Sequence, residues 1–174
     1  MRGNTLLRLR FLLALMMLAV GLSACGSSSG GGAGYGVAMG GSTRVPGLSC
    51  APFARELSGI ALYGDAADWW PQADGRYVRA DRPVLGGVLV FRRSGRLPSG
   101  HVSVVSRILG ARQVQVTQAN WVPGELDRDQ LVVDVSDAND WSAVRVWYPP
   151  VRQLGTYTYE TYGFILPRHP ATRD

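Results

Sequence analysis

The chain has 174 residues, of which 46% are hydrophobic and 18% charged, with two cysteines and a formal net charge of +5. This length and composition fit one folded domain with a single core, and they exclude a disordered chain, a disulfide-dense miniprotein and a polytopic membrane protein. Three arginines and no acid lie within residues 1–24, so the rest of the chain carries only +2. It has no dense basic stripe, and we expect no nucleic-acid partner.

Residues 1–24 have the pattern of an export signal. A basic start is followed by an apolar run over residues 11–20, which is too short to span a bilayer comfortably. Residues 22–25, Leu-Ser-Ala-Cys, resemble the lipobox of bacterial lipoproteins. The resemblance implies cleavage before Cys25 and a lipid on its thiol, and Gly26 after it favours the outer membrane, with the protein facing the periplasm. The alternative is an ordinary signal peptide that leaves Cys25 free.

The next segment is a predicted tether. Residues 25–42 contain the lipidated cysteine and a run dominated by Gly and Ser, which buries too little apolar surface to order itself. We therefore expect three parts: a lipoprotein signal peptide at 1–24, the tether at 25–42, and one domain at 43–174.

The domain is predicted to begin with a helix that starts at Cys50 and is capped by Ser49. An apolar stripe at helical spacing, expected to bury against a sheet, consists of Phe53, Leu57, Ile60 and Ala61. Gly64 ends this helix, and Asp65 is interpreted as a cap of a short second helix or as a catalytic acid. That second helix reaches Trp69 and Trp70.

Strands follow the helices. Their predicted ranges are 87–91, 101–107, 112–120, 131–135, 143–147 and 162–166. Helices first and a run of antiparallel strands afterwards indicate the α+β class.

Three residues have the chemistry of a thiol hydrolase. Cys50 lies in the partial positive field of a helix start, which favours a thiolate. His101 begins one strand and Asn120 ends its hairpin partner, and a turn near residue 110 places the two nearly opposite each other. A Cys nucleophile, a His base and an Asn that orients the His form a catalytic triad. The alternatives are structural roles for both Cys50 and His101, or His169 of the polar tail as the base.

Four short blocks resemble the CHAP domain, the cysteine- and histidine-dependent amidohydrolase/peptidase family of the papain-like clan. The blocks are Ser-Cys-Ala-Pro-Phe-Ala-Arg at 49–55, Gly-Asp-Ala at 64–66 with Trp69, Gly-His-Val-Ser-Val-Val at 100–105, and Gln-Ala-Asn-Trp at 118–121. They occur in the order of the family and span about 45–125. No single block is specific, and the assignment depends on the order and spacing of all four.

The resemblance implies a papain-like α+β fold, in which an N-terminal helix bearing the Cys packs on an antiparallel sheet bearing the His and the Asn. It implies that Cys50 is the nucleophile, His101 the base and then the acid, and Asn120 the third member. Many relatives have a glutamate where Gln118 stands. A neutral Gln118 or Asn120 orients the imidazole without the electrostatic support of a carboxylate, so we expect a less favoured thiolate–imidazolium pair.

The substrate implied by the resemblance is peptidoglycan, cut at the N-acetylmuramoyl-L-alanine amide or at a peptide cross-link. One alternative is a catalytically weak or inactive envelope lipoprotein that binds peptidoglycan stems in the same cleft, and another is a hydrolase of small amides. Trp69 and Trp121 are candidate substrate contacts, with core packing as the alternative. No residues have metal-ligand spacing and no phosphate-binding glycine loop is present, so we expect neither a metal nor a cofactor.

Overall fold

The computed structural model describes residues 38–168. The predictions made for residues 1–37, including the export signal and the lipid on Cys25, lie outside the described residues, as does His169. Within residues 38–168, no helix has the length and hydropathy needed to cross a membrane.

The described part consists mainly of strands. Its helices are α2 (Cys50–Ser58) and α3 (Trp69–Gln72), with the 3-10 helices η1 (Ala66–Asp68) and η2 (Pro149–Val151). Its strands are β1 (Ser42–Arg44), β2 (Arg79–Ala80), β3 (Val88–Phe91), β4 (His101–Gly110), β5 (Gln113–Ala119), β6 (Glu125–Asp134), β7 (Ala143–Tyr148), β8 (Gln153–Leu154) and β9 (Tyr159–Ile165).

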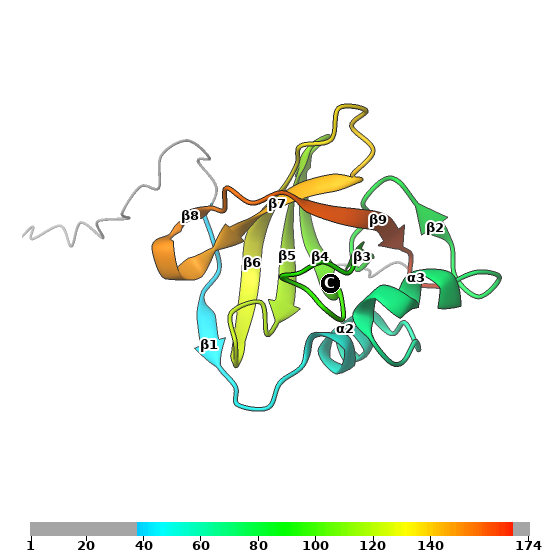
Figure 1. The fold of residues 1–174 in the computed structure, drawn as a ribbon, viewed down its shortest axis with the longest axis horizontal. Helices are drawn as coiled ribbons and strands as arrows, with labels where there is room; N and C mark the ends of the chain where they lie inside the picture. Colours follow the sequence, from blue (N-terminus) through cyan, green and yellow to red (C-terminus); the bar gives the residue numbers. More distant parts are fainter. Residues whose placement is uncertain (1–37, 169–174) are drawn as a thin grey trace, which may run out of the picture. The chain divides into compact units, whose positions relative to one another are not determined.

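Six of the strands close into a barrel. They follow the order β6-β5-β4-β3-β9-β7, and a further pairing of β7 with β6 completes the ring (Figure 1). Every pairing is antiparallel. Three short strands extend the ring, because β1 pairs with β6, β8 with β7 and β2 with β9.

The predicted papain-like α+β arrangement, a helix packed on an antiparallel sheet, is wrong. The described part is mostly β, its sheet is a closed barrel, and α2 and α3 have only nine and four residues. The six predicted strands all occur, but closure depends on β9 pairing with both β3 and β7. These contacts join segments far apart in the chain, and a strand pattern carries no information about them.

Apolar residues form two layers that share β3. Leu89 and Phe91 belong to the core inside the barrel, and Val88 and Val90 belong to the layer between the barrel and the helices. Side chains alternate between the two faces of a strand, and both faces of β3 are covered. This explains the continuous apolar run that the sequence has here.

Helix α2 packs on β4 and β5 mainly through small side chains, and of the predicted stripe Ile60, just beyond the helix, is completely buried. Ala51 and Ala54 are buried, which allows the helix to approach the barrel closely. Phe53 is half-buried and Leu57 is 50% exposed, and both line a hollow of about 430 Å³ beside β4 and β5. The helix ends at the left-handed Gly59, earlier than predicted.

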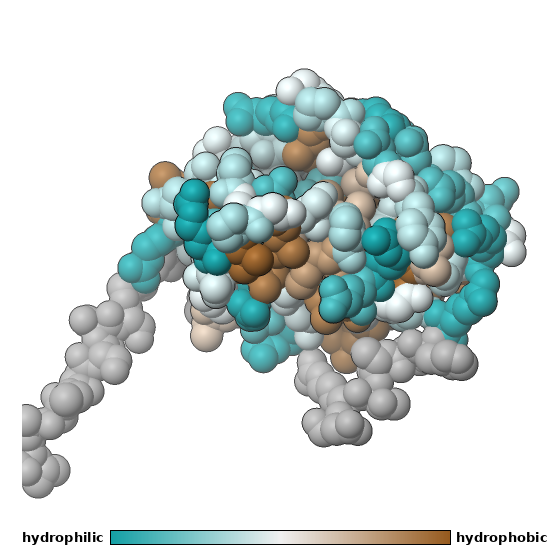
Figure 2. All heavy atoms as spheres, turned by 90° about the horizontal axis from the view of Figure 1, so that it is seen from below, coloured by the Kyte–Doolittle hydropathy of each residue, from teal (hydrophilic) through white to brown (hydrophobic). Residues whose placement is uncertain are grey.

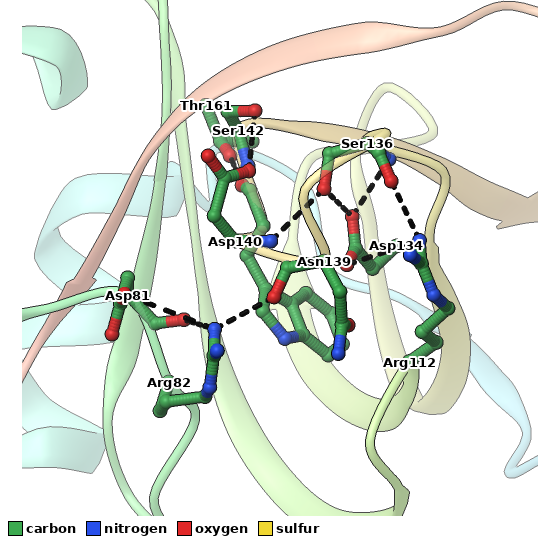
Figure 3. A network of polar contacts seen from close by, with 10 residues as sticks. Asp81, Arg82, Arg112, Asp134, Ser136, Asn139, Asp140, Ser142 and Thr161 are labelled. Atoms are coloured by element: carbon green, nitrogen blue, oxygen red, sulfur yellow. Dashed lines mark hydrogen bonds and ion pairs between the residues drawn. The ribbon is translucent and has the colours of Figure 1, made fainter.

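A polar network fixes the loop between β6 and β7 (Figure 3). The buried Asp134 carboxylate accepts hydrogen bonds from the Ser136 N–H and hydroxyl at 2.8 and 2.6 Å. Arg112, which precedes β5, donates to the Ser136 carbonyl at 2.6 Å, and Asp140 accepts from the Ser142 N–H at 3.0 Å. The network holds the loop in place beside the buried Trp141 of the inner core.

The segment in front of β1 is attached to the barrel. Gln115 donates to the Ala38 carbonyl at 2.7 Å, and Gln130 donates to the Gly40 carbonyl at 2.9 Å. A Cβ on Gly40 would lie 2.3 Å from the Arg128 carbonyl oxygen, so the chain passes close to β6. Residues 38–42, the part of the predicted tether that the structure describes, therefore belong to the fold.

Candidate active site

Cys50 is the first residue of α2 and lies next to the start of β4. Ser49 occupies the N-cap position, although its side chain makes no capping hydrogen bond. Burial raises the pKa of the Cys50 thiol, and it outweighs the backbone N–H groups of Val102, Ala51 and Cys50, which act on the sulfur in the opposite direction. The resting side chain is therefore a half-buried, neutral thiol.

His101 is the first residue of β4 and is only 3% exposed. Its ring contacts those of Phe91 and Trp121, with centroid distances of 5.4 and 5.0 Å. Burial lowers the pKa of His101 to about 4, against the opposite effect of a hydrogen bond with Gln118. At neutral pH the imidazole is therefore uncharged and able to accept a proton.

Gln118 on β5 is the residue that contacts the His101 imidazole. The distance between His101 Nε2 and Gln118 Oε1 is 3.0 Å, and both side chains are buried. A carbonyl oxygen only accepts, so this contact requires a proton on Nε2. Nδ1 is then the unprotonated nitrogen, the one able to act as a base.

Asn120 lies just beyond β5 and points elsewhere. It is exposed, has a left-handed φ of 62°, and its Oδ1 accepts a hydrogen bond from the Gly124 N–H at 2.9 Å. The β4–β5 register agrees with the predicted hairpin, since Val104 lies opposite Thr117. The β4–β5 pairs end at Thr117, however, and strand β5 ends at Ala119, so Asn120 belongs to the following turn.

The structure brings Cys50 close to His101 without joining their side chains. The Cys50 sulfur lies near the N–H of Val102, the residue that follows His101. The hydrogen bonds of the described residues include none between the Cys50 thiol and the imidazole. With both groups neutral, the arrangement is a thiol beside a base and not a preformed ion pair.

Asp65 acts on Cys50 only through its charge, which contributes to the raised pKa of the thiol. It precedes η1 without a capping hydrogen bond, and its carboxylate forms an ion pair with Arg93 at 3.0 Å. Arg93 also binds Asp68 at 2.8 Å. These contacts give Asp65 a structural role beside α2 and not a contact with His101.

The two predicted tryptophan contacts have different surroundings. Trp69 is completely buried in the layer between the barrel and the helices. Trp121 is half-buried and lies against His101, and it also packs on Phe91 and Tyr159, at ring distances of 5.7 and 5.0 Å. Only Trp121 of this pair is placed to meet a molecule at the surface.

A groove of about 490 Å³ begins at Trp121. Its walls are rich in aromatic rings and contain one cationic side chain; they include Arg96, Tyr148, Gln153, Tyr157 and Tyr159. Figure 2 shows the molecule from below the view of Figure 1, which is the side on which α2 lies. Apolar residues gather near the middle of this mostly hydrophilic surface. Trp121, which packs on the buried His101, therefore also lines a groove that is open to solvent.

The sequence did not single out Arg96 or the tyrosines of this groove. They come from the β3–β4 connection and from residues 148–159, which only the closed barrel brings together. The last 30 residues contain four tyrosines, of which three line the groove, and this enrichment does not by itself point to a site.

Comparison with known families finds a match for the first part of the fold. Residues 40–120 match the family model of the CHAP domain. A comparison with curated proteins finds no match. The matched residues include Cys50, His101 and Gln118, whereas β6, β7 and β9 of the barrel lie beyond them.

The match confirms the resemblance that the four blocks indicated. A CHAP domain indicates a hydrolase of the peptidoglycan amidase or peptidase type, or a related function, with peptidoglycan as the substrate. Over residues 40–120, the chain is therefore similar to the CHAP domain family.

Proposed function

We propose that this protein hydrolyses amide bonds of peptidoglycan, either at the N-acetylmuramoyl-L-alanine bond or at a peptide cross-link. Cys50 is the nucleophile, His101 the base and then the acid, and Gln118 orients His101. The observation that carries the proposal is the buried contact between His101 and Gln118, which leaves Nδ1 as the basic nitrogen of a ring beside the Cys50 helix start. The role of orienting the His101 imidazole, which the sequence predicted for Asn120, is assigned to Gln118 in this proposal.

The reaction begins from the neutral pair. His101 Nδ1 takes the thiol proton as the Cys50 sulfur bonds to the amide carbon, and backbone N–H groups at the start of α2 stabilise the oxyanion. His101 then protonates the amine, the carbon–nitrogen bond breaks, and a thioester remains on Cys50. Water attacks this thioester, His101 takes the water's proton, and the acid leaves as the thiol is restored.

Muropeptide release from purified sacculi tests the proposal. The wild-type chain is expected to release fragments whose masses identify the bond that is cut, and Cys50→Ala is expected to release none. Equal release by the two proteins would contradict a Cys50 nucleophile.

Two neighbouring amides on β5 and its turn provide a matched pair of variants. Gln118→Ala removes the partner of the His101 ring, and we expect kcat/KM to fall by about 100-fold. Asn120→Ala removes a hydrogen bond within the turn, and we expect the rate per folded molecule to stay within about threefold of wild type. The opposite order of effects would return the orienting role to Asn120.

A weakly active or inactive protein that binds peptidoglycan stems is the second candidate. It is favoured by the raised pKa of Cys50 and the lowered pKa of His101, since both oppose the thiolate–imidazolium pair. Co-sedimentation of the Cys50→Ala variant with sacculi, together with no muropeptide release by the wild type, would select this candidate.

We also propose that a lipid on Cys25 anchors the protein to the outer membrane, facing the periplasm. The Leu-Ser-Ala-Cys pattern at residues 22–25 supports this location. Labelled palmitate is expected to enter the wild type and Cys50→Ser but not Cys25→Ser. Equal labelling of Cys25→Ser would overturn the assignment.

A further inference from the structure

Two buried polar atoms on neighbouring strands lack hydrogen-bond partners within the described part of the chain. They are Gln118 Nε2 on β5 and Asp127 Oδ2 on β6. Gln118 and Asp127 are directly opposite each other in the antiparallel ladder. Directly opposed residues have Cβ atoms about 4.5–5.5 Å apart, within reach of a Gln and an Asp side chain. One atom only donates and the other only accepts.

Asp127 is an unusual residue at this position. Its side chain is completely buried, and no cationic side chain of the described residues forms an ion pair with it. Burial raises its pKa, while the Ser42 hydroxyl and the Val122 N–H, which donate to the carboxylate, act in the opposite direction. Ser42 occupies Oδ1. A buried carboxylate without a cation is costly, so its remaining oxygen requires a donor.

We infer that Asp127 is a positioning residue of the active site: it accepts a hydrogen bond from Gln118 Nε2 and thereby holds Gln118 Oε1 on His101 Nε2. The inference rests on the proposed function for its catalytic meaning. A Gln side chain presents oxygen on one side and N–H on the other, so either end is able to face an imidazole. A carboxylate accepts only, and it fixes which end of Gln118 faces Asp127.

The orientation of Gln118 determines the tautomer of His101. With oxygen toward the ring, Nε2 carries the proton and Nδ1 is the base. With the amide reversed, Nε2 accepts and the proton moves to Nδ1, where it blocks proton transfer from Cys50. Asp127 also supplies negative charge one side chain away from the ring, which favours the imidazolium formed during the reaction.

Ser103 is the competing partner for Gln118. Its buried hydroxyl also lacks a partner, and it precedes Val104, the partner of Thr117, in the same ladder. A hydroxyl donates as well as accepts, so it does not select one orientation of the amide. Only Asp127 has that property.

The test uses Asp127→Asn and the double variant Gln118→Glu with Asp127→Asn. In Asp127→Asn, we expect the amide oxygen to keep the Ser42 hydroxyl as its donor, so that the new N–H group faces Gln118. We expect the Gln118 amide to reverse. Imidazole nitrogen NMR should then show the His101 proton on Nδ1, and kcat/KM on sacculi should fall by about 100-fold.

The double variant restores the complementarity. The introduced carboxylate at position 118 accepts from both His101 Nε2 and the new amide at position 127, so we expect the proton to return to Nε2. We expect kcat/KM to recover to within about fivefold of wild type. A purely structural role for Asp127 predicts lower stability and no rescue by the change at position 118.

Two controls make the same kind of change nearby. Asp129→Asn alters another β6 carboxyl group that makes no side-chain hydrogen bond in the described part, and Ser103→Ala removes the competing hydroxyl. Both are expected to keep the His101 proton on Nε2. A tautomer switch in Ser103→Ala but not in Asp127→Asn would overturn the inference, as would a double variant no more active than Asp127→Asn.

A crystal structure of the wild-type chain gives a test that needs no variant to fold. Gln118 Nε2 and Asp127 Oδ2 must lie within hydrogen-bond distance, directly or through one ordered water. Separate partners for the two atoms would refute the inference. The NMR result is independent of hydrolysis, so a tautomer switch in an inactive protein would reject the proposed function and keep the role of Asp127.

Discussion

The His101 ring packs on Phe91 and Trp121, and its burial there determines its charge. Among residues 38–168, the neutral Gln118 is the only side chain that forms a hydrogen bond with the imidazole. Without a neighbouring carboxylate in direct contact, burial dominates and the uncharged ring is favoured. Such a ring is uncharged at neutral pH and takes up a proton from solvent only in acid.

Acid is expected to destabilise the protein between about pH 6.5 and pH 4. The pKa of His101 is about 4 in the folded state and 6.5 when unperturbed, so the unfolded chain binds more protons in this window. The free energy of unfolding should fall as the pH falls, by about 3 kcal/mol at pH 4. Urea unfolding at pH 7 and pH 4 measures it. His101→Gln should lose much less, and an equal loss would exclude His101 as the cause.

Cys50 should react slowly with iodoacetamide at neutral pH. Burial raises its pKa, so little thiolate is present, and the rate should increase with an inflection above the ordinary value of about 8.5. The measurement is made on Cys25→Ser, which leaves Cys50 as the one thiol of the chain. An inflection below pH 7 would instead demonstrate a preformed ion pair with His101.

At the scale of elements, the connection between β3 and β4 sets the position of His101. Gly100 comes directly before His101 and has a φ of 72°, a conformation that glycine adopts readily. A Cβ there would lie 2.7 Å from both the Phe91 carbonyl oxygen and the Ala67 Cβ. The backbone therefore passes tightly between β3 and η1 just before the imidazole.

Gly100→Ala should therefore harm both stability and activity. We expect a loss of about 2–4 kcal/mol, because the new methyl group meets backbone and the positive φ is strained. The rate per folded molecule should also fall, since any relief moves His101. Gly95→Ala is the control in the same connection, where a Cβ meets nothing within 4 Å. Similar values for the two variants would show that the close approach at Gly100 is unimportant.

The β5–β6 turn connects the site to Asp127. Trp121 packs on His101, and the N–H of the next residue, Val122, donates to the Asp127 carboxylate. Asn120 begins this turn with a left-handed φ and closes it by accepting from Gly124. The residue predicted to orient His101 thus shapes the turn that places Trp121.

At the scale of the molecule, the site and the polar network of Figure 3 lie near opposite ends of β5. Gln118 is close to the end of that strand, and Arg112, which donates to Ser136, precedes its start. About six residues of extended chain correspond to roughly 20 Å. The barrel therefore separates the candidate site from the polar residues that stabilise the β6–β7 loop.

Asp134→Ala should lower stability without lowering the catalytic rate. The substitution leaves the Ser136 N–H and hydroxyl without their acceptor beneath the loop, and we expect a loss of about 2–4 kcal/mol. Thermal unfolding and muropeptide release per folded molecule measure the two effects. Asp137→Ala, at an exposed position of the same loop, should change neither. A lower rate in folded Asp134→Ala would show that the two ends are coupled.

Much of the local structure was predictable from the sequence. The helix at Cys50, six strands and the β4–β5 register followed from apolar periodicity, turn residues and hairpin geometry, which depend on neighbours in the chain. Asp127 was missed because β6 was predicted to begin at residue 131, whereas it begins at Glu125. The first half of β6 is rich in polar residues and lacks an apolar strand pattern, so Asp127, the residue opposite Gln118, was not assigned to a strand.

The sequence by itself determined the candidate nucleophile and base, because Cys50 and His101 occur in short blocks whose order is typical of the CHAP domain. Only the tertiary structure decided the fold class and the partner of the imidazole. Barrel closure depends on pairing between strands far apart in the chain, and the hydrogen bond between His101 and Gln118 depends on which β5 side chain faces the ring. The energies of those contacts come from burial and pairing in three dimensions, which spacing along the chain does not encode.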